Sequence, residues 1–247
     1  MYNVSMIISV KNDFVKQLKS LKQEKDILCL DNPKLIAEAI SDGWQILHII
    51  KTEKFRHCFS DDDILVSENV LNLFTNTKTS QGVVAFVKQK KLELAMPKGD
   101  FLILDNVQDP GNVGTLIRTA VGANFLDIYL INCASVCLDK TVRSTMGALF
   151  KCRVYEVKDD FLDTLKSWNK RIFITTMQGK NIYDVPFPKN IGLVIGNEGH
   201  GVSEKLQKIA TDNVSLPMQN NLESLNAGTS GSIMMYQITY GGKNVRS

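Results

Sequence analysis

The sequence predicts an α/β protein with two domains, a small N-terminal one and a larger C-terminal one built on a mostly parallel sheet. Short apolar runs alternate with amphipathic helical patterns along the chain, and the alternation becomes regular in the second half. Strands that alternate with helices indicate a parallel sheet, because each parallel pair needs a crossover connection. A lysine-rich segment with one proline and one glycine, 88–100, separates the two patterns, and a solvated strand edge with a loop is the alternative for it. We therefore expect a first domain at 1–90, a linker at 91–100 and a second domain at 101–247.

The first domain is predicted to be a small α/β unit. Phe14, Leu18 and Leu21 recur at helical spacing, and Pro33 can open a second helix that Gly43 ends. A short helix is expected near residues 70–74. Short apolar runs predict strands at 27–30, 46–50, 64–66 and 83–87.

The second domain begins with a continuous apolar run at 101–104, the pattern of a strand that helices cover on both faces. Further strands are expected at 128–131, 154–157, 172–174, 191–195 and 214–216. Helices are expected at 112–122, 141–150, 161–168 and 222–240.

The cysteine and histidine patterns argue against a metal site and against a disulfide framework. The five cysteines form no Cys-x-x-Cys pair and stand near no histidine cluster: Cys29, Cys58, Cys133, Cys137 and Cys152. His48, His57 and His200 share no ligand spacing, so we interpret them as ordinary surface or packing residues. An odd number of irregularly spaced cysteines indicates reduced thiols and a cytoplasmic protein.

Composition and charge exclude a membrane protein and leave the partner open. The chain is 44% hydrophobic and 22% charged, which is ordinary for a globular protein, and no stretch approaches the roughly 18 apolar residues of a membrane helix. The first five residues lack a basic segment and a cleavage site, so no secretory signal is expected. A net charge of +3 permits nucleic-acid binding without requiring it.

Three polar loops follow predicted strands, and the carboxyl edge of such a sheet is where chemistry is expected. In the first loop, a turn at 109–111 leads to Asn112, which can cap the next helix. Arg118 lies one helical turn after Gly114 and should reach back over it toward the loop. An arginine on an ordinary surface helix is an equally good interpretation of this spacing.

The second loop contains Gly196, Gly199 and Gly201, with Glu198 as its only carboxylate. Glycines here indicate positive-φ turns or a ligand close to the backbone. The pattern is neither a dinucleotide fingerprint nor a P-loop, and a tight turn with an exposed glutamate would also explain it.

The third loop follows Leu216 and contains polar residues that can cap the next helix. Asn220 as N-cap would place Glu223 at the third helical position, a variant of the capping box. Capping does not explain Asn226, because asparagine is a poor residue inside a helix.

Together the three loops resemble the signature motifs of the SpoU (TrmH-like) family of SPOUT RNA 2′-O-methyltransferases. The first motif is Asn106-Val107-x-x-Pro110-x-Asn112-x-Gly114-x-x-x-Arg118-x-Ala120. The second is Gly196-Asn197-Glu198-Gly199-x-Gly201, and the third is Pro217-Met218 followed by Glu223-Ser224-Leu225-Asn226. The order and the spacing both fit, and the likeness covers the chain from Phe101 onward. The first domain more loosely resembles the L30e-type RNA-binding domain that often precedes this catalytic domain.

The resemblance implies a deep trefoil knot, a cofactor and a dimer, none of which composition could indicate. S-adenosylmethionine is expected in the knot loops, and two copies of the chain are expected to form the working enzyme. The substrate implied is RNA, most often large-subunit (23S) ribosomal RNA. The residues expected to hold the cofactor are Leu193, Ile195, Gly196, Asn197, Gly201, Leu216, Met218, Ser224 and Leu225.

The resemblance also implies the catalytic residues, which are Asn112, Arg118, Glu198, Ser224 and Asn226. Arg118 would stand at the nucleophile, either as its base or as a cation that binds a neighbouring phosphate. We favour the cation, because a neutral arginine at pH 7 costs roughly 7 kcal/mol. The proton acceptor would then be a phosphate oxygen or water.

The chain departs from the family pattern at three places. Asn220 replaces a usual glycine, 227–231 replaces a usual Val-Ser-Val-Ala, and 31–33 differs from a usual Glu-Gly pair. The glycines in 227–231 should weaken a helix that is expected to pack in the dimer.

Several other functions stay open. They are methylation of transfer RNA, methylation of a base nitrogen, a non-catalytic RNA-binding or ribosome-assembly role, and a nucleotide-dependent oxidoreductase. The last lacks its phosphate-binding fingerprint.

Overall fold

The computed structural model describes residues 6–75 and 79–241. The prediction that there is no secretory signal rests on the first five residues, which lie outside the described part. The chain divides into two compact units. Unit 1 comprises Met1–Lys90 and Cys137–Val142, and unit 2 comprises Lys91–Val136 and Arg143–Ser247.

Unit 1 is built on a four-stranded sheet with the order β1-β4-β2-β3. The strand pairs β1–β4 and β4–β2 are antiparallel, and β2–β3 is parallel. Its elements are α1 (Asp13–Lys22), β1 (Ile27–Leu30), α2 (Pro33–Ser41), β2 (Gln45–Lys51), β3 (Ile64–Leu65), α3 (Glu68–Leu71) and β4 (Val83–Lys88). Each agrees in type and approximate position with the sequence prediction.

Local chemistry explains where the first two helices begin. The Asn12 side chain accepts a hydrogen bond from the backbone N–H of Phe14, and Asn32 does the same for Lys34. Both asparagines satisfy N–H groups that a helix leaves unpaired at its start. The helix faces then pack on the sheet, where Leu18 and Phe86 belong to one buried apolar cluster.

Unit 2 is built on a six-stranded sheet with the order β10-β8-β9-β5-β6-β7. Every neighbouring pair in it is parallel. The strands are β5 (Phe101–Asp105), β6 (Asp127–Ile131), β7 (Arg153–Val157), β8 (Ile172–Asn181), β9 (Gly192–Ile195) and β10 (Asp212–Ser215). Because β9 lies directly beside β5, the loops that follow these two strands leave the sheet side by side.

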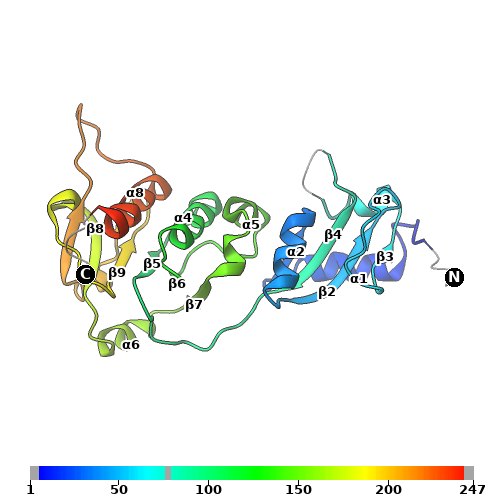
Figure 1. Cartoon of the computed structure of the whole chain (residues 1–247), viewed down its shortest axis with the longest axis horizontal. Coiled ribbons are helices and arrows are strands. Elements are labelled where there is room, and N and C mark those ends of the chain that lie inside the picture. The colour runs from blue at the N-terminus through cyan, green and yellow to red at the C-terminus, as the bar shows by residue number, and fades with distance from the viewer. Residues whose placement is uncertain (1–5, 76–78, 242–247) are drawn as a thin grey trace. The chain divides into compact units, whose positions relative to one another are not determined.

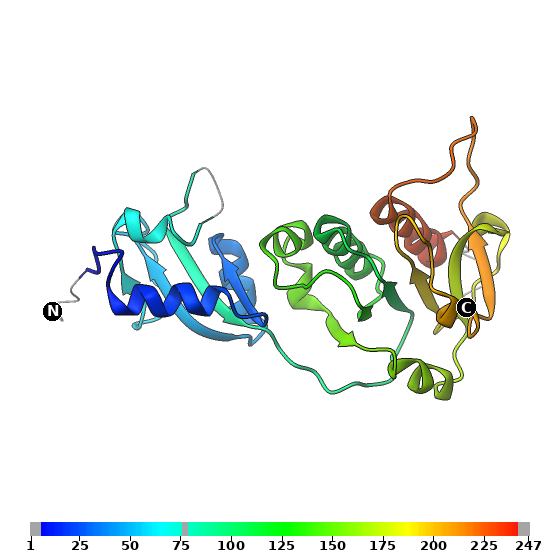
Figure 2. The same cartoon turned by 180° about the vertical axis from the view of Figure 1, so that it is seen from behind.

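Helices cover both faces of this sheet, as the fully buried β5 requires. The helices of this unit are α4 (Pro110–Gly122), α6 (Phe161–Ser167), α7 (Glu204–Gln207) and α8 (Ala227–Tyr240), with short 3₁₀ turns η1 (Ala148–Lys151) and η2 (Ile182–Asp184). The residues of α5 (Asp139–Thr145) are divided between the two units. On one face, Phe161 of α6 and Leu206 of α7 join the apolar cluster of the sheet. On the other face α4 and α8 lie side by side (Figures 1 and 2).

Helices α4 and α8 pack closely because α8 presents a glycine at the contact. A Cβ at Gly231 would stand 2.4 Å from Leu116 Cδ2 of α4 and 3.2 Å from Ile195 Cγ1 of β9. The Thr119 and Ser232 hydroxyls are 2.8 Å apart across the same interface. Gly231, one of the glycines expected to weaken this helix, therefore allows α8 to pack closely on α4 and β9 of the same chain.

Three predicted elements were wrong in extent. The helix expected at 141–150 is broken, since α5 ends at Thr145 and the next two residues, Met146 and Gly147, have positive φ. Strand β8 continues to Asn181, well past the apolar run that predicted it. The last helix begins at Ala227 rather than near residue 222, and the segment between β10 and α8 is an extended loop (Figure 2).

Candidate active site

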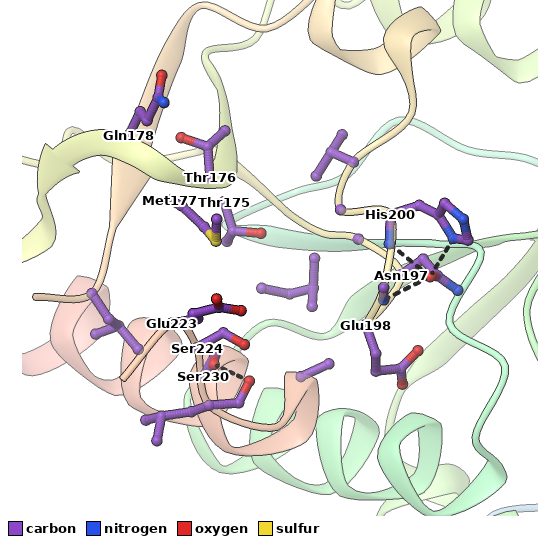
Figure 3. Close-up of a pocket in the computed structure, with 18 of the residues that line it drawn as sticks. Thr175, Thr176, Met177, Gln178, Asn197, Glu198, His200, Glu223, Ser224 and Ser230 are labelled. Atoms are coloured by element: carbon purple, nitrogen blue, oxygen red, sulfur yellow. Dashed lines mark hydrogen bonds between the residues drawn. The ribbon is translucent and has the colours of Figure 1, made fainter. Parts of the chain in front are cut away.

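A cavity of about 570 Å³ lies where the second and third polar loops meet β8 and α8. Its volume is within the range of about 300–1,000 Å³ that small-molecule sites occupy. The lining residues all belong to unit 2 (Figure 3). They are Thr175, Thr176, Met177, Gln178, Ile195, Gly196, Asn197, Glu198, Gly199, His200, Gly201, Val202, Gln207, Asn213, Leu216, Met218, Glu223, Ser224, Leu225, Ala227, Ser230 and Met234.

The loop after β9 is anchored to the end of β5. Buried Asp105 accepts a hydrogen bond from the Ser203 backbone N–H at 2.6 Å and another from the Asn106 side chain at 2.7 Å. The Asn106 carbonyl accepts from Asn197 Nδ2 at 2.9 Å. The bonds made by Ser203 and Asn197 fix both ends of the second loop to the end of β5.

Asn197 also shapes the second loop from within. Its Oδ1 accepts from the backbone N–H groups of Gly199 at 2.9 Å and His200 at 3.1 Å (Figure 3). The loop closes so tightly that a Cβ at Gly196 would stand 2.3 Å from the carbonyl carbon of Gly201. Only glycine fits at position 196, and the cavity wall there consists largely of backbone.

Asn112 and Glu198 link the first loop to the second. Asn112 Nδ2 donates to Glu198 Oε1 at 2.7 Å. The prediction that Asn112 caps α4 was wrong: Asp109 is the N-cap and accepts from the Asn112 backbone N–H at 2.9 Å. Pro110, whose φ suits the first helical position, starts the helix earlier and leaves the Asn112 side chain free to reach Glu198.

Asn226 is the N-cap of α8, and its Oδ1 accepts from the Thr229 backbone N–H at 3.2 Å. The sequence placed Asn226 inside a longer helix, where asparagine is unfavourable; its role as N-cap explains why it stands here. A Cβ at Gly228 would stand 3.1 Å from Asn226 Oδ1 and 3.2 Å from Asn112 Oδ1. The two asparagines thus approach each other across the start of α8, and Glu198 is bonded to one of them.

The third loop is exposed and turns through left-handed backbone. Asn220 and Asn221 both have a φ of 56°, which asparagine tolerates better than most residues. The proposed capping box was wrong, because Asn220 precedes no helix and Glu223 lies in the loop. Ser224 and Leu225 follow on the cavity wall.

The residues predicted to bind a cofactor line this cavity, with the exception of Leu193. Leu193 is fully buried in β9. Of the predicted catalytic residues, Glu198 and Ser224 line the cavity, and Asn112 and Asn226 contact its edge as described above. Arg118 is exposed on α4, does not line the cavity and has no hydrogen bond or ion pair within residues 6–75 and 79–241.

Sequence reasoning missed one wall of the cavity. Residues 175–178 of β8 line it, although the apolar run ended at Ile174. The general rule that sites form at the carboxyl ends of parallel strands would have directed attention to this polar half of β8. His200, interpreted as an ordinary residue, also lines the cavity, with Nδ1 3.2 Å from Asn197 Oδ1.

A partly buried thiol, Cys133, lies behind the first loop. Cys133 Sγ donates to the Leu104 carbonyl at 3.2 Å, and burial raises the pKa of this thiol to about 12. The group therefore stays protonated at neutral pH and is a poor nucleophile. The described residues contain no group of three or more His, Cys, Asp or Glu side chains suited to a metal ion.

No helix in the described ranges is both long and apolar enough to span a bilayer.

Comparison with known proteins relates this geometry to a family. The model of the SpoU rRNA Methylase family matches residues 100–236, which include all three polar loops. A 23S rRNA (guanosine(2553)-2′-O)-methyltransferase of Bacillus subtilis, RlmP, is 28% identical over 95% of this chain and 99% of its own.

Solved structures share the whole architecture. An rRNA methyltransferase from Sinorhizobium meliloti, crystallised with S-adenosylmethionine bound, superposes with a TM-score of 0.86 at 24% identity over 98% of this chain and 99% of that one. The SpoU methyltransferase AviRb from Streptomyces viridochromogenes gives a TM-score of 0.81 at 22% identity, over 95% of this chain and 99% of that one. At these identities the likeness establishes the fold.

Proposed function

Because the chain belongs to the SpoU rRNA Methylase family, we propose that it is an S-adenosylmethionine-dependent methyltransferase that methylates a ribose 2′-hydroxyl of large-subunit (23S) ribosomal RNA. The observation that carries the proposal is the cavity formed by the second and third loops. The bond between Asn112 and Glu198 couples that cavity to the helix of the first loop.

The residues present fit this cofactor. The cavity offers backbone groups of the loop closed by Gly196 and Gly201, and apolar side chains such as Leu216 and Met218 beside them. Such a mixture suits a nucleoside, whose base is flat and apolar and whose edge forms hydrogen bonds. We propose that Ile195, Asn197, Ser224 and Leu225 complete the cofactor site, with Leu193 supporting it from the core.

When bound, S-adenosylmethionine supplies a methyl group on a sulfonium, which is already a good electrophile. The protein then has to hold the ribose hydroxyl in line with that group, and such positioning can contribute about 7–11 kcal/mol. We assign it to Asn112, Glu198, Ser224 and Asn226, because bonds within and between the loops already orient Asn112, Glu198 and Asn226. Because these side chains are already held in place, they do not have to reorganise when the reaction occurs.

Arg118 is assigned to the RNA rather than to the cofactor. Its exposed guanidinium suits a phosphate next to the reacting nucleotide, where bidentate contacts are strong. A cation at that place lowers the pKa of the ribose hydroxyl, and a phosphate oxygen or water accepts the proton.

Arg118 does not line the cavity of its own chain, which supports a dimer as the working enzyme. We propose that the cavity of each copy receives Arg118 of the partner subunit. Helix α8 also exposes Tyr236 and Tyr240, which are 48% and 54% exposed and suit a protein interface. Light scattering of the purified chain at micromolar concentration tests the dimer.

Three further assignments accompany the activity. Unit 1 is proposed as an L30e-like RNA-binding domain, the loops around the cavity as parts of a deep trefoil knot, and the cytoplasm as the location. The name of the Bacillus subtilis relative supports ribosomal over transfer RNA as the substrate.

The activity is tested with purified protein and S-adenosylmethionine that carries a deuterated methyl group. Ribosomal and transfer RNA from cells that lack the gene are incubated separately and digested to nucleosides for mass spectrometry. The proposal expects the label on the ribose of a large-subunit rRNA nucleotide. Label on a base, label in transfer RNA alone, or binding of RNA without any transfer would contradict it and support the corresponding alternative.

A further inference from the structure

The charged groups that line the cavity are nearly all acidic. Glu198 and Glu223 are its two carboxylates, and no lysine or arginine lines it among the described residues. His200 is the one basic side chain in the lining, and its ring is turned toward Asn197 Oδ1. The cavity therefore presents an acidic surface to whatever it binds.

The two carboxylates differ in what they contact. Glu198 is engaged by Asn112 at 2.7 Å, and its side chain points away from the centre of the cavity toward a helix (Figure 3). Glu223 has no hydrogen bond or ion pair within the described part of the chain. Its carboxylate faces the cavity on the side of Thr175 and Met177 (Figure 3). Glu223 is thus the uncommitted negative charge at the site.

The cofactor and its product differ by one positive charge. S-adenosylmethionine carries a sulfonium, an ammonium and a carboxylate, which sum to +1. Transfer of the methyl group leaves a neutral thioether, so S-adenosylhomocysteine has a net charge of zero. A carboxylate facing the site attracts the first molecule more strongly than the second.

We infer that Glu223 is a specificity residue that makes the cavity prefer the positively charged cofactor over the neutral product. The inference rests on the proposed function, since it assumes that this cavity holds S-adenosylmethionine. In consequence Glu223 promotes product release, because the charge that it attracts disappears in the reaction. Its position in an exposed loop limits the effect, since water screens the attraction.

The test measures binding of three compounds to the full chain by calorimetry. S-adenosylmethionine and sinefungin both have a net charge of +1, because sinefungin carries an ammonium in place of the sulfonium, and S-adenosylhomocysteine has none. Glu223→Gln should weaken the two cationic compounds about fivefold and leave S-adenosylhomocysteine within twofold. Glu93→Gln, which removes an exposed carboxylate that does not line the cavity, should change none of the three.

The outcomes separate this inference from the function on which it rests. Equal weakening of all three compounds in Glu223→Gln would show a structural role for the residue and overturn the inference. Unchanged binding of all three would overturn it as well. A wild-type chain that binds none of the compounds would refute the cofactor itself, and the inference with it.

Discussion

Asn112 and Glu198 stand 86 residues apart in the chain and are joined by a 2.7 Å hydrogen bond between an amide nitrogen and a carboxylate oxygen. The bond connects the helix after β5 with the loop after β9. It exists because β9 lies directly beside β5 in the sheet, although β6, β7 and β8 come between the two strands in the sequence. The cavity therefore depends on sheet order as much as on the residues that line it.

Replacing Asn112 with aspartate should test this bond directly. Asn112→Asp places a second carboxylate against Glu198 and should lower the free energy of unfolding by about 1–3 kcal/mol. Glu198→Gln in the same chain removes the repulsion and restores a donor and an acceptor, so most of the loss should be recovered. Urea unfolding of the two single variants and the double variant gives the coupling free energy between the two side chains. Additive effects of the two substitutions would show that the side chains do not interact.

Arg118→Ala should abolish methyl transfer and leave the affinity for S-adenosylmethionine within a few-fold. The reason is that Arg118 is exposed and does not line the cavity, so its loss removes an RNA contact and no cofactor contact. Single-turnover transfer to rRNA and calorimetric binding measure the two quantities. Arg118→Lys, which keeps the charge and loses the bidentate geometry, should retain part of the rate. Near-normal turnover of Arg118→Ala would remove the residue from the mechanism.

Gly231→Ala should destabilise unit 2 by about 1–3 kcal/mol, because overpacking forces α8 away from α4. The added methyl would stand 2.4 Å from Leu116 Cδ2. Gly99→Ala is the matched control, since a Cβ there meets nothing within 4 Å. Denaturant unfolding monitored by tryptophan fluorescence compares the two. Equal stability of both variants would show that α8 does not pack as described.

The thiols should react in an order set by burial. Burial raises the pKa of Cys29, Cys133 and Cys152 to about 12, whereas Cys58 is exposed. At pH 8, iodoacetamide should therefore label Cys58 in the native protein and leave the other three until unfolding, as read by peptide mass spectrometry. Labelling of Cys133 as fast as Cys58 under these conditions would contradict its burial.

The raised pKa values of Cys29, Cys133 and Cys152 also determine how the free energy of unfolding changes with pH. A thiol whose folded-state pKa is raised keeps its proton in the native protein after the unfolded chain has lost it. The contribution to stability is complete below about pH 9 and is lost as the pH rises toward 12.

The sequence predicted the elements that are governed by local patterns. The apolar run at 101–104 became β5, and Pro33 stands at the start of a helix, as predicted. A strand covered on both faces must be apolar along its length, so its pattern is visible without knowledge of the fold. Polar strand residues such as those of β8 beyond Ile174 carry no such pattern.

Helix ends and side-chain partners were less predictable, because competing local solutions have similar energies. Asp109 and Asn112 are both good N-caps, and so are Asn220 and Asn226. In each pair the tertiary structure selected one: Asp109 caps α4, and Asn226 caps α8. Of the other two, Asn112 donates from α4 to Glu198, and Asn220 lies in the third loop.

Methylation of a ribose hydroxyl in ribosomal RNA by this chain can be tested by mapping the methylated positions in living cells. Total RNA is compared from cells with the gene, without it, and with the Arg118→Ala form, by resistance of each linkage to alkaline cleavage. We expect one large-subunit rRNA position that resists cleavage only when the unaltered gene is present. Identical maps from all three strains would contradict it.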